Sequence, residues 1–215
     1  MSPYLAEFLS LALIHFLAVV APGPDFAVTV RQSVRYGRAV GLYTALGIGA
    51  GISVHVLYTL VGIGALMHAL PWLLGIAKIV GGIYILYLGV SLLRSKSASD
   101  EHGPVAVSHR DTQSAFAAFR VGFLTNATNP KATLFFLAIF TTVVSGQTPI
   151  QIQALYGVWM CGVNAAWFML VSVLFSSVRV RQTFLRMGHW FERIMGAVLV
   201  FFALRLLLSI LPPFS

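Results

Sequence analysis

Six long apolar stretches, separated by shorter polar or basic segments, dominate the chain. They cover residues 4–30, 40–67, 72–93, 115–145, 151–176 and 189–210. A helix needs about 20 consecutive, mainly apolar residues to cross a bilayer, and each stretch reaches that length. The pattern therefore predicts an all-α membrane protein with six transmembrane helices.

The longest polar interruption falls near the middle of the chain. Residues 95–104 read Ser-Lys-Ser-Ala-Ser-Asp-Glu-His-Gly-Pro, a composition that is typical of a linker. We therefore expect a first three-helix unit over residues 1–94, a cytoplasmic linker over 95–113 and a second three-helix unit over 114–215.

Basic residues mark every second connection between the apolar stretches. Lys and Arg occur around the connections 31–38, 94–120 and 179–186. None occurs in residues 1–3, 68–71, 146–150 and 211–215. Since basic connections stay in the cytoplasm, this pattern predicts that both termini lie outside. An odd number of spans in each unit then places the two units in opposite orientations, the inverted repeat of many secondary transporters.

Two short similarities support an internal duplication. Pro24-Asp25-Phe26-Ala27 aligns with Pro130-Lys131-Ala132-Thr133, and Lys78-Ile79-Val80-Gly81-Gly82 aligns with Arg193-Ile194-Met195-Gly196-Ala197. The matches fall in the first and third spans of each unit, which is the order that an inverted repeat requires.

The first and fourth stretches are unusually long and contain prolines followed at once by a charged residue. The two interruptions are Pro22-Gly23-Pro24-Asp25 and Asn129-Pro130-Lys131. Proline is favoured at the first position of a helix, where its missing N–H would have no partner. We therefore expect Gly23 and Asn129 to be N-caps and Pro24 and Pro130 to begin half-helices within the membrane.

The charges at these breaks point to a transport site. The positive end of a helix dipole favours Asp25, but it disfavours Lys131 by roughly 0.3–1 kcal/mol. A charge near the bilayer centre costs about 2.5–3.5 kcal/mol on insertion scales, so an anion must compensate Lys131, either Asp25 or a substrate carboxylate. The predicted substrate-binding residues are Gly23, Pro24, Asp25, Asn126, Asn129, Pro130 and Lys131. The alternatives are a structural Asp25–Lys131 ion pair, or snorkelling of each charge toward an interface.

Other polar residues within the spans allow two readings. His15, His55 and Asn164 either line a water path or make hydrogen bonds that only stabilise helix packing. Tyr84 and Tyr87 are expected to be packing or interfacial aromatics rather than ligands.

Composition excludes several other classes of protein. Of the 215 residues, 58% are hydrophobic and only 9% are charged, whereas soluble domains carry about 25% charged residues. The net charge of +8 is explained by topology rather than by a nucleic-acid partner. The single cysteine, Cys161, leaves no cysteine pair for a thiol relay or a thiolate metal site, and no metal or cofactor is expected.

Several segments together resemble the lysine exporter and homoserine–threonine efflux family. They are Ala21–Phe26, Gly37–Leu42 with Ala45–Gly47, Lys78–Tyr84 with Tyr87–Gly89, Gly122–Asn126 and Asn129–Ala132 with Phe135 and Phe136. These matches occur in the expected order over spans 1 to 4, and the resemblance covers essentially the whole chain.

The resemblance implies a bacterial inner-membrane exporter of amino acids that is coupled to the proton gradient. A zwitterionic substrate would place its carboxylate at Lys131 and its ammonium toward Asp25. Asp25 is the best candidate for reversible protonation, because desolvation disfavours its charged form and a bound cation favours it. The exported amino acid is left open, as is the formation of a homo-oligomer.

Rival functions lack their sequence signals. An enzyme is not expected, because no H-E-x-x-H or G-x-S-x-G motif is present. A membrane subunit of an ATP-driven transporter remains an alternative, but it would need a separate ATPase, since the chain has no phosphate-binding G-x-x-x-x-G-K-[ST] loop.

The orientation can be tested with single cysteines at Ser99 and Ser215 in a Cys161→Ala background. An impermeant maleimide added to intact cells should label the cysteine at position 215 and leave the one at position 99 unlabelled, because position 215 is expected outside and position 99 in the cytoplasm. The reverse labelling pattern would refute the orientation.

Overall fold

The computed structural model describes residues 3–69, 71–94 and 112–210, and these residues form eight α-helices. The helices are α1 (Pro3–Val20), α2 (Pro24–Tyr36), α3 (Arg38–Ala69), α4 (Pro71–Leu93), α5 (Ala115–Ala127), α6 (Pro130–Thr142), α7 (Ile150–Phe175) and α8 (Val178–Ile210). No strand occurs in this part of the chain. The fold is therefore all-α, as predicted. The expected linker lies almost entirely outside the described residues.

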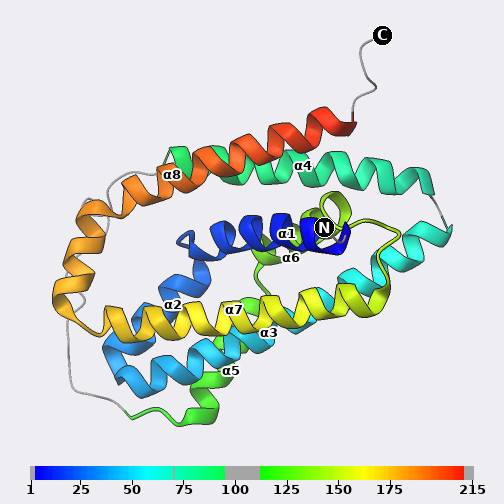
Figure 1. The fold of residues 1–215 in the computed structure, drawn as a ribbon. Coiled ribbons are helices and arrows are strands. Elements are labelled where there is room, and N and C mark those ends of the chain that lie inside the picture. Colours follow the sequence, from blue (N-terminus) through cyan, green and yellow to red (C-terminus); the bar gives the residue numbers. More distant parts are fainter. Residues whose placement is uncertain (1–2, 70, 95–111, 211–215) are drawn as a thin grey trace.

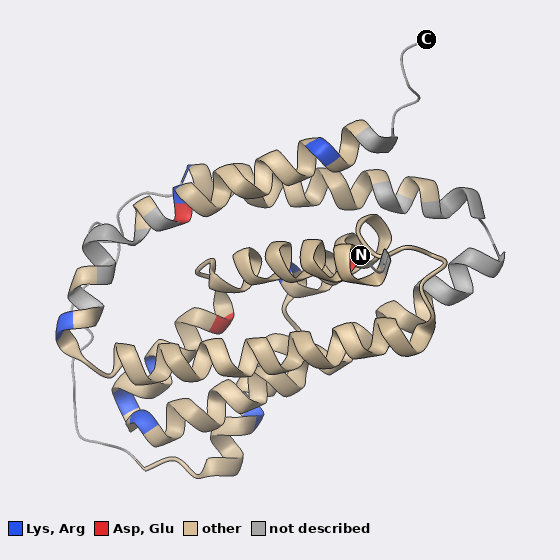
Figure 2. Ribbon diagram, viewed as in Figure 1, with Lys and Arg blue, Asp and Glu red and all other residues tan. Residues whose placement is uncertain are grey.

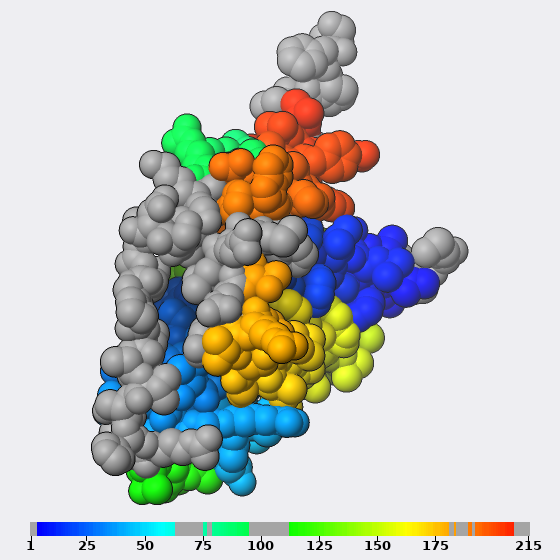
Figure 3. Space-filling model, turned by 90° about the vertical axis from the view of Figure 1, so that its left-hand side faces the viewer, coloured from blue at the N-terminus to red at the C-terminus, as the bar shows by residue number. Residues whose placement is uncertain are grey.

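The helices are arranged in three levels, with α1 and α6 in the middle (Figure 1). On one side α4 and α8 pack against each other, and α4 also packs on α6. On the other side α3 packs against α5, α7 and α2. The end view in Figure 3 shows the α4–α8 pair and the α3–α5 pair at opposite edges of the molecule. The two broken helices are thus enclosed between two outer layers.

Helix length and hydropathy identify two spans directly. Arg38–Gly62 and Ile150–Phe175 are each long and apolar enough to cross a membrane. The pair Tyr4–Val20 and Pro24–Tyr36, bent by 52° at the break, forms a third span if it is counted as one. Within the described residues the shorter apolar helices Ile79–Leu93 and Pro130–Thr142 do not meet that length. The count of six spans and the inverted repeat therefore stay predictions.

Two helix boundaries differ from the expected ones. The last apolar stretch was expected to begin at residue 189, but α8 begins at Val178 and includes the basic segment 179–186. That segment contains neither Gly nor Pro, and arginine is a good helix former. Helix α2 likewise continues to Tyr36 and ends at Gly37, whose φ of 98° suits a residue without a Cβ.

Basic residues gather at one end of the bundle. Several of the described Arg residues lie where α2 meets α3 and at the start of α8 (Figure 2). The start of α1 and the end of α8 lie toward the opposite end (Figure 1). This distribution agrees with the connections that the sequence predicted to be cytoplasmic.

Hydrogen bonds fix both halves of the broken first span. At its start, Glu7 accepts hydrogen bonds from the Ser145 backbone N–H at 2.7 Å and from the Thr148 hydroxyl at 3.0 Å. In α2, the Ser33 hydroxyl donates to the Ser172 hydroxyl of α7 at 2.9 Å. Helix α1 is thus bonded to the segment after α6, and α2 is bonded to α7. These separate contacts stabilise the bend between α1 and α2.

Glycines allow α3 to approach its neighbours closely. A Cβ on Gly47 would collide with the carbonyl oxygen of Phe119, and one on Gly122 would collide with that of Thr44. These two contacts bring the backbones of α3 and α5 together, as small residues do in membrane helix pairs.

Gly47→Ala should therefore destabilise the protein, whereas Gly62→Ala in the same helix should not. Nothing lies within 4 Å of a Cβ placed on Gly62. We expect Gly47→Ala to cost about 1–3 kcal/mol or more, the usual range for overpacking. Thermal unfolding of the purified proteins in detergent measures the difference, and equal midpoints for the two variants would contradict it.

Candidate functional site

The first helix break lies between α1 and α2. Gly23 is the N-cap of α2, with extended backbone angles of −168° and −167° and no side chain to cap the helix. Pro24 is the first helical residue and Asp25 the second. The amide end of α2 therefore stays open to a ligand.

The second break lies between α5 and α6. Asn129 is the N-cap of α6, and its Oδ1 accepts a hydrogen bond from the Lys131 backbone N–H at 3.0 Å. Pro130 begins the helix. Both predicted N-caps are thus confirmed, but only the second break is closed by a side chain.

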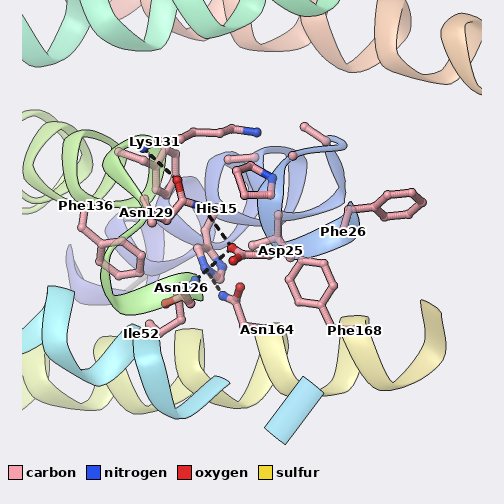
Figure 4. Close-up of a pocket in the computed structure, with 17 residues that line it drawn as sticks. His15, Asp25, Phe26, Ile52, Asn126, Asn129, Lys131, Phe136, Asn164 and Phe168 are labelled. Atoms are coloured by element: carbon pink, nitrogen blue, oxygen red, sulfur yellow. Dashed lines mark hydrogen bonds between the residues drawn. The ribbon is translucent and has the colours of Figure 1, made fainter. Parts of the chain in front are cut away.

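Asp25 joins the two breaks. Its Oδ2 accepts hydrogen bonds from the side-chain amides of Asn126 at 2.9 Å and Asn129 at 3.3 Å (Figure 4). Its Oδ1 is buried and has no hydrogen-bond partner within the described residues. One carboxylate oxygen is therefore held by the opposite break, and the other is left for a ligand or a proton.

His55 supports this arrangement from α3. Its Nε2 lies 2.9 Å from the backbone oxygen of Asn126, and its Nδ1 lies 3.0 Å from the Tyr58 hydroxyl. Since a carbonyl oxygen only accepts, Nε2 carries a proton. The ring is fully buried and stacks on Phe136. His55 thus makes hydrogen bonds and packs, the second of the two readings of the sequence.

Lys131 extends toward the first break and does not pair with Asp25. A Cβ placed on Gly23 would lie 3.5 Å from the Lys131 ammonium nitrogen. Among the described residues this ammonium has no hydrogen-bond acceptor and no carboxylate within 4 Å. A direct structural ion pair between Asp25 and Lys131 is therefore not formed.

A cavity of about 50 Å³ lies between the breaks (Figure 4). It is lined by six of the seven predicted site residues: Gly23, Pro24, Asp25, Asn126, Asn129 and Lys131. His15 of α1 and Asn164 of α7 add polar groups to its wall. The structure thus brings together residues that lie about a hundred positions apart in the sequence.

A second cavity of about 350 Å³ adjoins the first through Lys131. Its lining includes Pro22 and Pro130 from the breaks and Tyr84, Tyr87 and Ser91 from α4. The Tyr84 hydroxyl donates to the Lys131 backbone oxygen at 3.1 Å. Tyr84 packs against the core and against the Tyr87 ring, as the sequence interpretation expected, but that interpretation did not place the two tyrosines beside a cavity. Their spacing with Ser91, which places all three on one helix face, was the available signal.

His15 and Asn164 form a buried pair in the wall of the smaller cavity. The Asn164 side-chain nitrogen donates to the Met160 backbone oxygen at 3.0 Å and lies 2.9 Å from His15 Nε2. The first bond identifies that atom as the amide nitrogen, so His15 Nε2 accepts and Nδ1 carries the proton of the neutral ring. Nδ1 is buried without a hydrogen-bond partner in the described part of the chain.

These groups suit a zwitterion. The site presents one unpaired carboxylate oxygen and one unpaired ammonium, on different helices. Within the described residues no group of three or more His, Cys, Asp and Glu side chains could hold a metal ion.

Comparisons with known proteins identify the family of the chain. The family model described as LysE type translocator matches residues 16–210. The threonine efflux protein of Escherichia coli (strain K12) is 28% identical over 207 residues, which cover 94% of this chain and 98% of the relative. The threonine efflux protein of Salmonella typhi is 28% identical over 204 residues, again 94% of this chain and 98% of the relative.

A further relative is the uncharacterized membrane protein YahN of Escherichia coli (strain K12), 29% identical over 210 residues that cover 96% of this chain and 91% of the relative. No solved structure matches the chain. The chain therefore belongs to the LysE-type translocator family and is a membrane transporter rather than an enzyme.

Proposed function

We propose that the protein exports an amino acid, threonine or a close relative, across the bacterial inner membrane in exchange for protons. Membership of the translocator family and the similarity to threonine efflux proteins support export as the direction. The geometry of the two breaks supports an amino acid as the substrate.

The observation that carries the proposal is the pair of unsatisfied opposite charges. Oδ1 of Asp25 is buried without a hydrogen-bond partner within the described residues. The Lys131 ammonium interacts with Asp25 only through space, without a direct contact. Burying an unpaired charge is costly, and truly structural ion pairs are closed by direct contact. An α-amino acid brings one ammonium and one carboxylate, and it satisfies both groups at once.

The two cavities divide the substrate between them. The smaller one, of about 50 Å³, has room for the ammonium group beside Asp25. The larger one, of about 350 Å³, reaches the size of small-molecule sites and takes the rest of the molecule. Lys131 lies in the wall of both and binds the carboxylate, next to the open amide end of α2.

Proton exchange follows from the hydrogen bonds of Asp25. Because Oδ2 already accepts from two amides, Oδ1 is the atom that takes either a proton or the substrate ammonium. Binding of one therefore excludes the other, as exchange transport requires. Protonation of Asp25 removes the negative charge that binds the substrate ammonium, so it lowers the affinity for the substrate.

Alternating access would come from six spans in two inverted units that rock about this site. In support, corresponding helices pack against each other across the units, α3 on α7 and α4 on α8. Both proposed units begin with a broken helix. The gathering of basic residues at one end supports a cytoplasmic location for that end and external termini (Figure 2).

Gly23→Asp should block the anion position, and Gly23→Asn is its matched control. Both side chains cap α2, but only Asp places a carboxylate beside the Lys131 ammonium. Losing one charge-assisted contact of about 1.5–3 kcal/mol should weaken substrate affinity by roughly 10- to 100-fold in Gly23→Asp. Threonine efflux from loaded vesicles, normalised to membrane abundance, compares the two. Equal efflux by both variants would show that Lys131 does not bind the substrate carboxylate.

The charges are tested together by Asp25→Asn/Lys131→Gln. Removing both leaves no unpaired charge, so the double variant should insert and fold better than either single variant. It should nevertheless fail to export, because neither end of the zwitterion has its partner. Membrane abundance and vesicle efflux are the two measurements. Substantial efflux by the double variant would reduce the pair to a structural role.

A further inference from the structure

The two histidines buried in the membrane-spanning helices have unlike surroundings. His55 is 0% exposed, and both of its ring nitrogens have a partner. His15 is 1% exposed, but only Nε2 has a partner, and its Nδ1–H is left over. His15 lines the cavity that also holds Asp25, whereas His55 does not.

The unpaired groups of His15 and Asp25 are complementary. Nδ1 of His15 is a donor without an acceptor, and Oδ1 of Asp25 is an acceptor without a donor. A buried polar group without a partner costs about 1–3 kcal/mol. Both residues line one cavity of about 50 Å³, and a water molecule needs about 10–15 Å³ of such space and two to four polar partners. The cavity that both residues line therefore has the volume that a water molecule needs.

We propose that His15 is a positioning residue that holds a water molecule against Oδ1 of Asp25, and that this water delivers the coupling proton. The inference rests on the proposed exchange of an amino acid for protons. The water accepts a hydrogen bond from His15 Nδ1–H and donates one to Oδ1. When an excess proton reaches the water, one O–H bond of the hydronium breaks, an O–H bond forms at Oδ1, and neutral water remains.

The other titratable or charged groups near Asp25 are His55 of α3, which reaches it through Asn126, and Lys131 of α6. Helices α5 and α7 contribute the neutral amides Asn126 and Asn164 to the cavity. Among these groups the donors without a partner in the described residues are Nδ1–H of His15 and the Lys131 ammonium, and the ammonium is the group assigned to the substrate carboxylate.

The position of His15 also agrees with the direction of proton entry. It lies in α1, between the start of the helix and the break at Val20. In the proposed topology this part of α1 is the outer half of the span. A water held there lies on the outward side of Asp25, the side from which protons enter during export.

The test uses three variants of the full-length protein in proteoliposomes. The amide of Asn reaches the position of Nδ1, that of Gln reaches the position of Nε2, and Leu has no donor. For each protein, the flux of labelled L-threonine driven by a pH gradient is divided by its threonine–threonine exchange at equal pH. We expect this ratio to fall by about tenfold or more in His15→Leu and His15→Gln, and to stay close to wild type in His15→Asn.

The ratio separates positioning from a structural role. A merely structural loss lowers both fluxes together and leaves the ratio unchanged, which would overturn the inference. If His15→Leu does not fold, the comparison of His15→Gln with His15→Asn takes its place. Equal flux ratios for these two variants would also overturn the inference. Threonine transport that is driven by a sodium gradient at equal pH would also overturn the inference.

Failure of the proposed function looks different from failure of this inference. A wild-type protein that exchanges threonine but gains nothing from a pH gradient refutes proton coupling, and the inference with it. A wild-type protein that responds to the gradient, together with an unaffected His15→Leu variant, refutes only the role of His15.

Discussion

A helix that breaks within a bilayer leaves amide and carbonyl groups that no solvent can satisfy, and the structure is organised around this constraint. At the second break the Asn129 side chain caps the Lys131 amide, and His55 donates to the Asn126 carbonyl. His55 reaches that carbonyl because α3 and α5 approach closely at Gly47 and Gly122. The packing of two distant helices thus stabilises the break that forms the site.

The two breaks have unlike chemistry, and this difference gives the site its polarity. The second is closed by the Asn129 cap, whereas the first has Gly23 and no cap side chain. A Cβ on Gly23 would lie 3.5 Å from the Lys131 ammonium nitrogen, an ordinary contact distance. The cation of the second half therefore lies at the helix end of the first, and Asp25 of the first is held by amides of the second.

Local sequence was sufficient for some features and insufficient for others. The positions of both N-caps followed from the prolines alone, because proline lacks the N–H that a helix interior needs. The start of α8 at Val178 did not follow from the sequence, because charge and apolarity mark where a membrane begins and not where a helix begins. Tyr84 was read as a packing or interfacial aromatic, because no local pattern shows that its hydroxyl meets the Lys131 backbone.

The sequence by itself determined that the chain is helical, that it belongs in a membrane and that new helices begin after Gly23 and Asn129. These properties depend on hydrophobic content and on backbone chemistry within a few residues. Only the tertiary structure decided which atoms are left unpaired: Oδ1 of Asp25, the ammonium of Lys131 and Nδ1 of His15. A hydrogen-bond partner can come from any helix, so the absence of one is fixed only when all the described helices are packed together.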